Sequence, residues 1–412
     1  MVDLAWKDGV LHLEGASLAE AARLFGTPLY LYSQKAMLRR LECLKGAFAG
    51  MPHKVCFAVK ANSNLSILQA LARAGSGFDI VSLGELAKVL AAGGDPAQVV
   101  FSGVGKKREE MAEALLKGIH CFNIESSAEL FVLEEVARAL GRPAPVAIRV
   151  NPGVEVPTHG HIATGRPTDK FGVEVNMAHA LAIQASQSPH MRFLGLDMHV
   201  GSQVMDLEVF ASALAKVVSL AKELKKSGIE VQHIDAGGGL GVGEGAPVLE
   251  SWVKTVMEVI SPLGAEAIIE PGRALVAEAG VLLTKVEYIK ENGGVLFAVV
   301  DAGMNDFLRP ALYGAKHPVQ AVRQGPGIAG TYDVVGPVCE SGDFLARQVP
   351  LAIAQGDFLA VGQAGAYAMS MSSNYNARPR PAEVMIEEGR MRLIRAREAF
   401  DDLMRHEAPF LL

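Results

Sequence analysis

The stretch VCFAVKANSNLSILQALARAGSGFDIVS, residues 55–82, contains a β-rich run, an amphipathic helical run and a second β-rich run. This alternation continues along the chain, and the later β-rich runs are VVFSG (99–103), CFNI (121–124), VAIRVN (146–151), FLGLDMHV (193–200), HIDAGGG (233–239) and AIIEPG (267–272). The runs are almost continuously apolar, as in strands that are buried on both faces. Eight strand–helix units predict a parallel (β/α)8 barrel.

The chain is long enough for two domains, because its 412 residues exceed the roughly 250 to 300 at which single cores stop growing. After Arg273 strand and turn signals replace the regular helices, and Asn292-Gly293-Gly294 predicts a hairpin turn. We therefore expect an α/β protein with a TIM barrel at residues 31–274. Residues 1–30 and 275–412 are expected to form a β-sandwich or β-barrel-like domain.

The N-terminal region is expected to contribute a strand to this second domain. LHLEG, residues 11–15, has a strand pattern, and Ser17 with Glu20 forms a capping box that predicts the start of a helix. TPLYLYS (27–33) follows that helix. We expect LHLEG to join the C-terminal sheet.

Composition and charge argue against several classes of function. A net charge of −6 and the lack of Lys/Arg runs make nucleic acid an unexpected partner. The start, MVDLAWKDGV, lacks the pattern of a signal peptide, and no apolar run is long enough for a bilayer, so no membrane and a cytoplasmic location are expected. Cys43, Cys56, Cys121 and Cys339 lack zinc or disulfide spacing, so no metal is expected, and the first three are interpreted as core residues.

Several predicted strands end in polar residues, at the end of the barrel where active sites lie. Lys60, Ser82, Arg149 and His199 are such residues. Desolvation of Lys60 would lower its pKa and favour the neutral amine that a Schiff base requires. Taken alone, a lysine at a strand end is more often simply solvated.

HIDAGGGLGVG, residues 233–243, follows the seventh predicted strand. Gly237, Gly238, Gly239 and Gly241 are expected to present consecutive backbone N–H groups to an anion, and phosphate sites recur after strands seven and eight of barrels. A plain tight turn is the alternative. A Rossmann nucleotide site is weaker, because no opening βαβ unit precedes these glycines.

EPGR, residues 270–273, closes the eighth strand. Glu270 could pair with a protonated pyridine nitrogen and so strengthen an electron sink, whereas an internal Glu270–Arg273 ion pair is the structural alternative. In DMHVGSQ (197–203) the imidazole of His199 could stack on a ring, with Ser202 near a phosphate. A lone histidine at a strand end is, however, often structural.

GPVCESGD, residues 336–343, places Cys339 beside Glu340 in a polar loop. The acid favours the protonated thiol, so Cys339 is a candidate proton donor to a carbanion. Arg309 in RPALY (309–313) offers a fork for a carboxylate, and Tyr313 and Tyr367 offer phenolic hydrogen bonds.

Together these segments resemble the pyridoxal-phosphate decarboxylases that combine a barrel with a β domain, and the likeness to the diaminopimelate decarboxylases covers nearly the whole chain. The motifs specific to that branch are CESGD (339–343), DAGMNDFLRPALY (301–313) and AGAYAMSMSSNYNARPRPAEV (364–384). The resemblance implies pyridoxal 5′-phosphate as cofactor and a small amino acid as substrate. It implies decarboxylation of meso-2,6-diaminopimelate to L-lysine, the last step of lysine biosynthesis.

The resemblance also implies roles for single residues. Lys60 corresponds to the Schiff-base lysine, His199 to the ring-stacking residue and Cys339 to the proton donor. The implied cofactor-binding residues are Lys60, His199, Ser202, Gly238, Gly239, Glu270, Gly272, Arg273 and Tyr367. The implied substrate-binding residues are Arg273, Arg309, Tyr313, Glu340 and Tyr367, with Glu340 on the distal ammonium and the arginines on the distal carboxylate.

In this family the counterparts of Cys339 and Glu340 reach the cofactor of a neighbouring subunit, which implies a homodimer with shared active sites. The segment around residues 158–172 departs from the family pattern. His161 stands where tyrosine is common, and Gly160 stands where proline is frequent.

Two other functions are alternatives to the decarboxylation of diaminopimelate. A same-fold decarboxylase of ornithine, arginine or carboxynorspermidine fits less well, because Glu340 and Arg309 together suit a substrate with a second amino-acid end. A pyridoxal-phosphate-binding relative without catalysis is the other rival, since fold alone does not fix function. Such a relative would be free to lose Lys60 or Cys339, and both are present.

Overall fold

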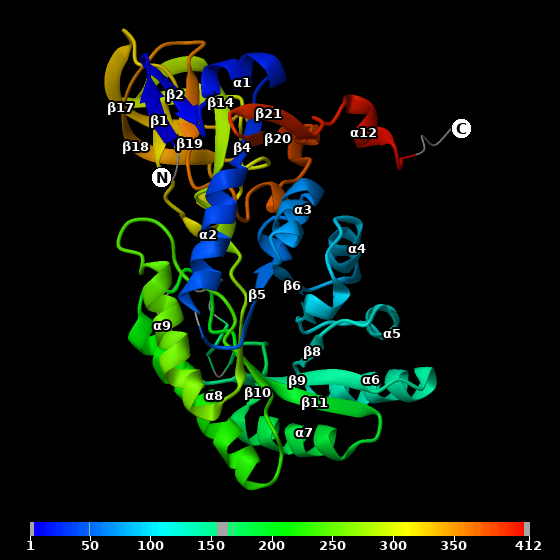
Figure 1. Ribbon diagram of the computed structural model, residues 1–412. Coiled ribbons are helices and arrows are strands. Elements are labelled where there is room, and N and C mark those ends of the chain that lie inside the picture. The colour runs from blue at the N-terminus through cyan, green and yellow to red at the C-terminus, as the bar shows by residue number, and fades with distance from the viewer. Residues whose placement is uncertain (1–3, 49, 155–163, 167, 408–412) are drawn as a thin grey trace, which may run out of the picture. The chain divides into compact units, whose positions relative to one another are not determined.

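The computed structural model describes residues 4–48, 50–154, 164–166 and 168–407, and its chain divides into two compact units (Figure 1). The barrel unit is Leu38–Leu275, and the β unit combines Met1–Met37 with Val276–Leu412. The expected boundary at residues 30 and 31 would cut the strand β4 (Leu29–Ser33), which lies wholly within the β unit.

The eight predicted barrel strands are all present, and every neighbouring pair is parallel. The last strand pairs with the first, so the sheet closes into the predicted barrel. The strands are β5 (His53–Ala58), β6 (Gly77–Ile80), β7 (Val99–Phe101), β8 (Cys121–Ile124), β9 (Ala144–Asn151), β11 (Met191–Asp197), β12 (His233–Asp235) and β13 (Glu266–Ile269). A short strand, β10 (Val173–Glu174), adds to β9.

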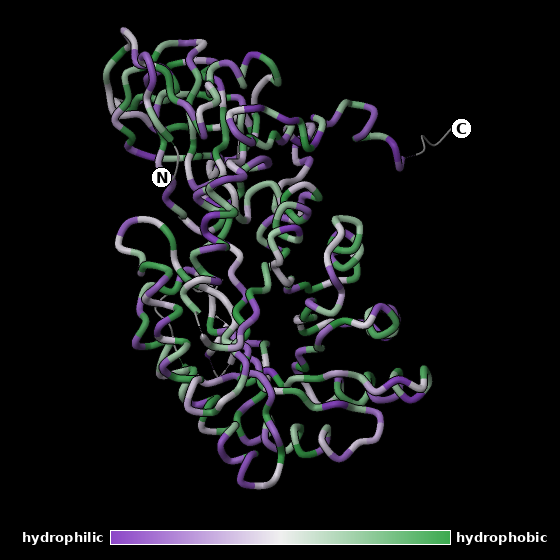
Figure 2. The backbone as a smooth tube through the Cα atoms, viewed as in Figure 1, coloured by the Kyte–Doolittle hydropathy of each residue, from purple (hydrophilic) through white to green (hydrophobic). Residues whose placement is uncertain are grey.

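Helices alternate with these strands along the chain. They are α2 (Gln34–Ala47), α3 (Leu65–Arg73), α4 (Leu83–Ala91), α5 (Arg108–Lys117), α6 (Ser127–Leu140), α7 (Val175–Gln187), α8 (Leu207–Lys226), α9 (Leu249–Ile260) and α10 (Arg273–Val276), with 3-10 turns η1 (Val59–Ala61), η2 (Pro96–Gln98) and η3 (Ser261–Leu263). Hydrophobic and hydrophilic residues are interspersed along α8 (Figure 2). Its apolar residues are buried on one face of the helix. No helix within the described residues is both long and apolar enough to cross a membrane.

Side-chain caps start several helices at the end of the barrel where the strands finish. Ser82 Oγ accepts a hydrogen bond from Glu85 N at 3.2 Å and so caps α4, and Asn64 Oδ1 caps α3 by accepting from Ser66 N at 2.9 Å. Ser82, which the sequence offered as a polar strand end, therefore has a structural role as a helix cap.

Two of the three cysteines predicted in the core are buried there. Cys56 and Cys121 pack with Val100, Ala147 and other buried side chains of neighbouring strands. Cys43 is exposed on α2, so the prediction is wrong for this residue. Leu41 and Leu44 on either side of it are buried, but Cys43 lies on the outward face of the helix with Glu42.

The β unit is built on a nine-stranded sheet whose main order is β18-β17-β15-β14-β4-β20-β21, with β19 on β14 and β16 on β19. Its remaining strands are β14 (Gly280–Asn292), β15 (Val295–Val300), β16 (Val319–Ala321), β17 (Ile328–Val335), β18 (Phe344–Ile353), β19 (Phe358–Val361), β20 (Ala382–Glu387) and β21 (Arg390–Arg395). The hairpin predicted at Asn292-Gly293-Gly294 joins β14 to β15. Short helices are α1 (Leu18–Phe25), α11 (Arg309–Tyr313) and α12 (Phe400–Met404).

The β unit takes in the N-terminal strands, as predicted, but LHLEG lies in a small sheet of its own, and the N-terminal strand of the large sheet is β4. LHLEG contributes to β2 (Val10–Leu13), which pairs with β1 (Leu4–Lys7) and β3 (Ala16–Ser17). This small sheet meets the C-terminal segment, since Leu11 N donates to Val322 O at 2.9 Å and Val10 forms a β-bridge with Arg323. Two tight turns, at residues 8–9 and 14–15, have positive φ at both positions and favour this local pairing. The predicted helix start is confirmed, because Ser17 caps α1.

Candidate active site

Lys60 lies in η1, directly after β5, and its ammonium contacts the buried carboxylate of Asp79 on β6. Burial, reinforced by the charge of Glu270, raises the pKa of Asp79 to about 7, although Lys60 opposes the shift. Asp79 is therefore able to hold a proton near neutral pH. The pair can move one proton between nitrogen and oxygen, which would leave Lys60 as a neutral amine.

Glu270 follows β13 and is buried, and each of its two carboxylate oxygens lies near a different side chain. Ser102 Oγ donates to Glu270 Oε1 at 3.4 Å, and Glu270 Oε2 lies 3.7 Å from His199 Nδ1. Burial opposes ionisation, but His199, Lys60 and Arg149 outweigh it and lower the pKa of Glu270 to about 2. Glu270 is thus an anion at neutral pH.

His199 follows β11, and the backbone of the next loop fixes its proton. Gly238 N donates to His199 Nδ1 at 3.2 Å, which places the ring proton on Nε2. Burial lowers the pKa of His199 even though Glu270 acts in the opposite direction. The imidazole is therefore neutral.

Most amides of the glycine run after β12 are already engaged within the protein. Gly237 N donates to Asp235 Oδ1 at 2.9 Å, and Gly241 N donates to Val204 O at 3.0 Å. With Gly238 N on His199, the prediction of consecutive N–H groups open to an anion is wrong. Within the described part of the chain, Gly239 N is the one amide of these four that has no partner.

The glycines instead allow three loops to approach closely. A Cβ on Gly238 would lie 2.1 Å from Glu270 O, and one on Gly239 would lie 2.2 Å from Gly201 O. Any larger residue would push apart the loops that follow β11, β12 and β13.

Ser202 and Arg273 come from two of these loops and meet. Arg273, which follows Gly272 and begins α10, donates from Nη2 to Ser202 Oγ at 2.9 Å. A Cβ on Gly239 would meet Gly201 O, so the loops that carry Gly239 and Ser202 lie close together. One guanidinium and one hydroxyl therefore meet next to a glycine loop that has one free amide, and such donors suit an anion.

A buried cluster of acids lies behind Glu270. Asp197, Asp235 and Glu270 each place an oxygen within 4.8 Å of the others, and Arg149 Nε lies 3.7 Å from Asp197 Oδ2. Burial and the charge of Glu270 raise the pKa of Asp197 and of Asp235. Three carboxylates at this spacing also suit a cation, so the expected lack of a metal stays a prediction.

The other predicted site residues lie in the β unit. On α11 the guanidinium of Arg309, a buried residue, is 5.6 Å from the centre of the Tyr313 ring. Cys339 and Glu340 are exposed neighbours between β17 and β18. Tyr367 has a φ of +53°, in the left-handed region.

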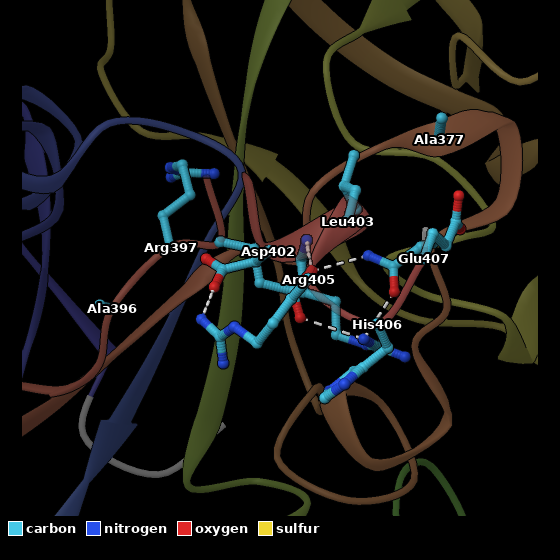
Figure 3. Close-up of a pocket in the computed structure, with 11 residues that line it drawn as sticks. Ala377, Ala396, Arg397, Asp402, Leu403, Arg405, His406 and Glu407 are labelled. Atoms are coloured by element: carbon cyan, nitrogen blue, oxygen red, sulfur yellow. Dashed lines mark hydrogen bonds and ion pairs between the residues drawn. The ribbon is translucent and has the colours of Figure 1, made fainter. Parts of the chain in front are cut away.

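A pocket of about 720 Å³ near the C-terminal end of the β unit is lined mainly by charged residues (Figure 3). Arg405 pairs with Asp402 there, and Arg380 pairs with Glu398 at 3.1 Å. None of the predicted site residues lines this pocket.

The barrel residues fit pyridoxal phosphate. Lys60 offers the amine, and Glu270 offers an anion for the pyridine nitrogen. His199 offers a neutral flat ring, while Arg273, Ser202 and Gly239 N offer donors for a phosphate. The charges and donors match the chemistry of each part of the cofactor.

Sequence reasoning missed Asp79, Asp197 and Asp235, although a signal was available. Each carboxylate interrupts an apolar strand that is buried on both faces, in GFDI, LGLD and HID. A charge in such a strand needs a partner, so it indicates a polar site within the barrel. Gly160 and His161, singled out in the sequence, lie outside the described residues.

Comparison with known proteins places these features in context. The model of the pyridoxal-binding domain of pyridoxal-dependent decarboxylases matches residues 34–277. The chain is 49% identical over 411 residues to the diaminopimelate decarboxylase of Pseudomonas aeruginosa, covering 99% of each chain.

Two solved structures resemble the whole chain. Diaminopimelate decarboxylase from Helicobacter pylori, complexed with L-lysine, is 42% identical with a TM-score of 0.91, and the match covers 94% of this chain and 98% of that one. Diaminopimelate decarboxylase from M. jannaschii, in co-complex with L-lysine, is 35% identical with a TM-score of 0.94, covering 99% and 98%.

Proposed function

This chain belongs to the family of pyridoxal-dependent decarboxylases, and we propose that it converts meso-2,6-diaminopimelate to L-lysine and carbon dioxide with pyridoxal phosphate held at Lys60. The observation that carries the proposal is its 49% identity to a diaminopimelate decarboxylase over 99% of both chains. The reaction would be the last step of lysine biosynthesis.

The cofactor, when bound, accepts the electrons released as the bond to the α-carboxylate breaks. Lys60 holds the cofactor and exchanges its ammonium proton with Asp79, whose pKa of about 7 suits that exchange. Glu270 stays ionised and would serve the pyridine nitrogen, and the neutral ring of His199 would stack on the cofactor ring. Arg273, Ser202, the loops at Gly238, Gly239 and Gly272, and Tyr367 would hold the phosphate.

The β unit supplies most of the groups that recognise the substrate and complete the reaction. Glu340 binds the distal ammonium. Arg309 of the β unit and Arg273 of the barrel unit bind the distal carboxylate with help from Tyr313 and Tyr367. When carbon dioxide has left, Cys339 Sγ donates its proton to the α-carbon and later regains one from solvent. Ornithine offers no distal carboxylate for an arginine, which disfavours it as a substrate.

The active unit is a homodimer in which Cys339 and Glu340 serve the barrel of the partner subunit. Both side chains are exposed in the single chain, which leaves them available to a partner. The β unit would then supply substrate contacts and the dimer interface together.

We place the protein in the cytoplasm. Its four cysteines are all free, and free thiols are typical of proteins in a reducing compartment.

Lysine formation from meso-diaminopimelate, with and without added pyridoxal phosphate, tests the function directly. Ornithine, arginine and carboxynorspermidine are assayed beside it at equal concentration. We expect cofactor-dependent lysine and little product from the others. A preference for one of the three would establish the rival decarboxylase, and no turnover of any would support a non-catalytic relative.

A further inference from the structure

The loop that carries Cys339 and Glu340 is contacted by two consecutive residues of another loop in the β unit. Tyr375 Oη donates a hydrogen bond to Glu340 Oε1 at 2.6 Å. Cys339 N donates to Asn376 Oδ1 at 3.2 Å. One loop therefore holds the side chain of Glu340 and the backbone of Cys339 at the same time.

The contacting residues lie in a turn with an unusual backbone. Asn376 and Ala377, in the 3-10 turn η5 (Tyr375–Ala377), have φ values of +56° and +53°. Asparagine tolerates this left-handed region, but alanine adopts it rarely, so surrounding contacts must hold it. The conformation directs the side chains of two successive residues to the Cys339 loop.

Those surrounding contacts are the ion pair and hydrogen bonds at the base of the turn. Asn374 Nδ2 donates to Glu398 Oε2 at 2.6 Å, and Arg380 Nη1 donates to Asn374 Oδ1 at 2.7 Å and to Glu398 Oε1 at 3.1 Å. These three residues line the wall of the pocket in Figure 3. The residues on this side of the pocket therefore stabilise the turn.

We propose that Tyr375 and Asn376 are positioning residues, Tyr375 fixing the direction of the Glu340 carboxylate and Asn376 fixing the backbone at Cys339. The proposal rests on the proposed function, in which Glu340 reads the distal ammonium and Cys339 delivers the proton. An exposed glutamate otherwise samples many rotamers, and a single orientation is needed to read one ammonium group. The phenol occupies Oε1 and leaves Oε2 for the substrate.

The phenol remains a donor through the neutral range. The hydrogen bond to Glu340 and the charge of that carboxylate raise the pKa of Tyr375, because ionisation would lose the bond and place two anions together.

Tyr375→Phe tests the first half of the proposal in the cofactor-loaded enzyme. We expect the KM for meso-diaminopimelate to rise about tenfold with kcat within about twofold, because orientation of a binding group is lost. Glu340→Gln should raise KM further, and adding Tyr375→Phe to it should change nothing more. Tyr288→Phe, on an exposed tyrosine of β14, is the matched control and should leave both constants unchanged.

Asn376→Gly tests the second half, since glycine keeps the left-handed backbone but removes the acceptor from Cys339 N. We expect kcat to fall about fivefold with little change in KM, because the proton donor is displaced. Asn376→Asp retains an acceptor oxygen and should restore most of kcat.

Ultraviolet titration of tyrosine tests the contact without turnover. The difference between the titration curves of the wild type and Tyr375→Phe isolates the ionisation of Tyr375. Its midpoint should lie at a higher pH than that of exposed tyrosines, and it should move to lower pH in Glu340→Gln.

If the wild type shows no turnover, the proposed function and the positioning role that depends on it are both overturned. Normal wild-type turnover with an unchanged KM in Tyr375→Phe, or no titration shift in Glu340→Gln, overturns the positioning role of Tyr375 alone. An unchanged kcat in Asn376→Gly overturns that of Asn376.

Discussion

Gly238 donates its backbone N–H to His199 Nδ1 at 3.2 Å, and a Cβ at the same glycine would lie 2.1 Å from the carbonyl oxygen of Glu270. One glycine therefore sets both the tautomer of the imidazole and the distance between two loops of the site.

Gly238→Ala should abolish cofactor binding, because the new methyl group must displace the Glu270 backbone or the His199 loop. The measurement is the dissociation constant of pyridoxal phosphate, followed by absorbance. Gly105→Ala is the control, since a Cβ there meets nothing within 4 Å. Equal affinity of the two variants would show that the loops separate easily.

Lys60→Ala should lose the visible absorbance of protein-bound cofactor and at least about 10³-fold in turnover, because the covalent anchor is gone. Lys254→Ala, on an exposed helix surface, should keep both. Full turnover in Lys60→Ala would remove the assigned role.

Mixing two inactive variants tests whether active sites are shared. Cys339→Ala alone should keep the cofactor absorbance and lose turnover, since it lacks the proton donor. After subunit exchange with Lys60→Ala, half the dimers are hybrids with one intact site, so about a quarter of wild-type activity should return. If each site is built from one chain, no activity returns.

Glu270→Gln should reduce turnover on the order of 10²-fold, since the charge opposite the pyridine nitrogen is lost. The cofactor-free protein should unfold at a lower temperature at pH 7. The lowered pKa of Glu270 means that the folded state stabilises its charge, and glutamine loses that stabilisation. Glu258→Gln, on an exposed side chain, is the control. An unchanged unfolding temperature of the Glu270→Gln apoprotein would contradict this account.

Two histidines in the barrel unit, His233, which is buried, and His120, which is half-buried, should make the protein sensitive to acid. Burial lowers the pKa of His120 to about 4 and of His233 to about 3, and their ring centres are 5.5 Å apart. In the unfolded chain each titrates near about 6.5. At a pH between the folded and unfolded pKa values, the unfolded state binds more protons than the folded state. The free energy of unfolding therefore falls as the pH decreases, and each histidine contributes up to about 1.4 kcal/mol for each pH unit.

Urea unfolding between pH 7 and pH 5 measures this dependence. Replacing both histidines by glutamine should flatten the slope, whereas His406→Gln, on an exposed residue, should not. An unchanged slope in the double variant would assign the acid sensitivity to other groups.

The barrel could be predicted from the sequence because each strand is a short apolar run that ends in a turn or a polar residue. Lys60 and Glu270 could be located for the same reason, since the end of a strand is visible as a change in polarity. Asp79 was missed because the apolar pattern of a strand does not show which side chain of the neighbouring strand will pair with its carboxylate. In the structure that partner is Lys60.

Hydrogen-bond partners were the part that the sequence did not reveal. The glycines at 237 and 238 suggest free amides, yet Asp235 and His199 accept from them, and both acceptors depend on how adjacent strands align in register. LHLEG was assigned to the wrong sheet because period-two alternation identifies a strand but not its neighbour. The contacts of Tyr375 and Asn376 join loops far apart in the sequence and leave no local pattern.

The strand β4 pairs with β14 on one side and β20 on the other, although residues 29–33 leave the ribosome long before residues 382–387. The barrel segment, 38–275, is continuous and can fold while synthesis goes on. At about 5–20 residues per second, β4 waits tens of seconds on the nascent chain with its hydrogen-bonding edges open. An open strand edge invites pairing with other chains, so β4 is exposed to that hazard for longer than the strands of the barrel.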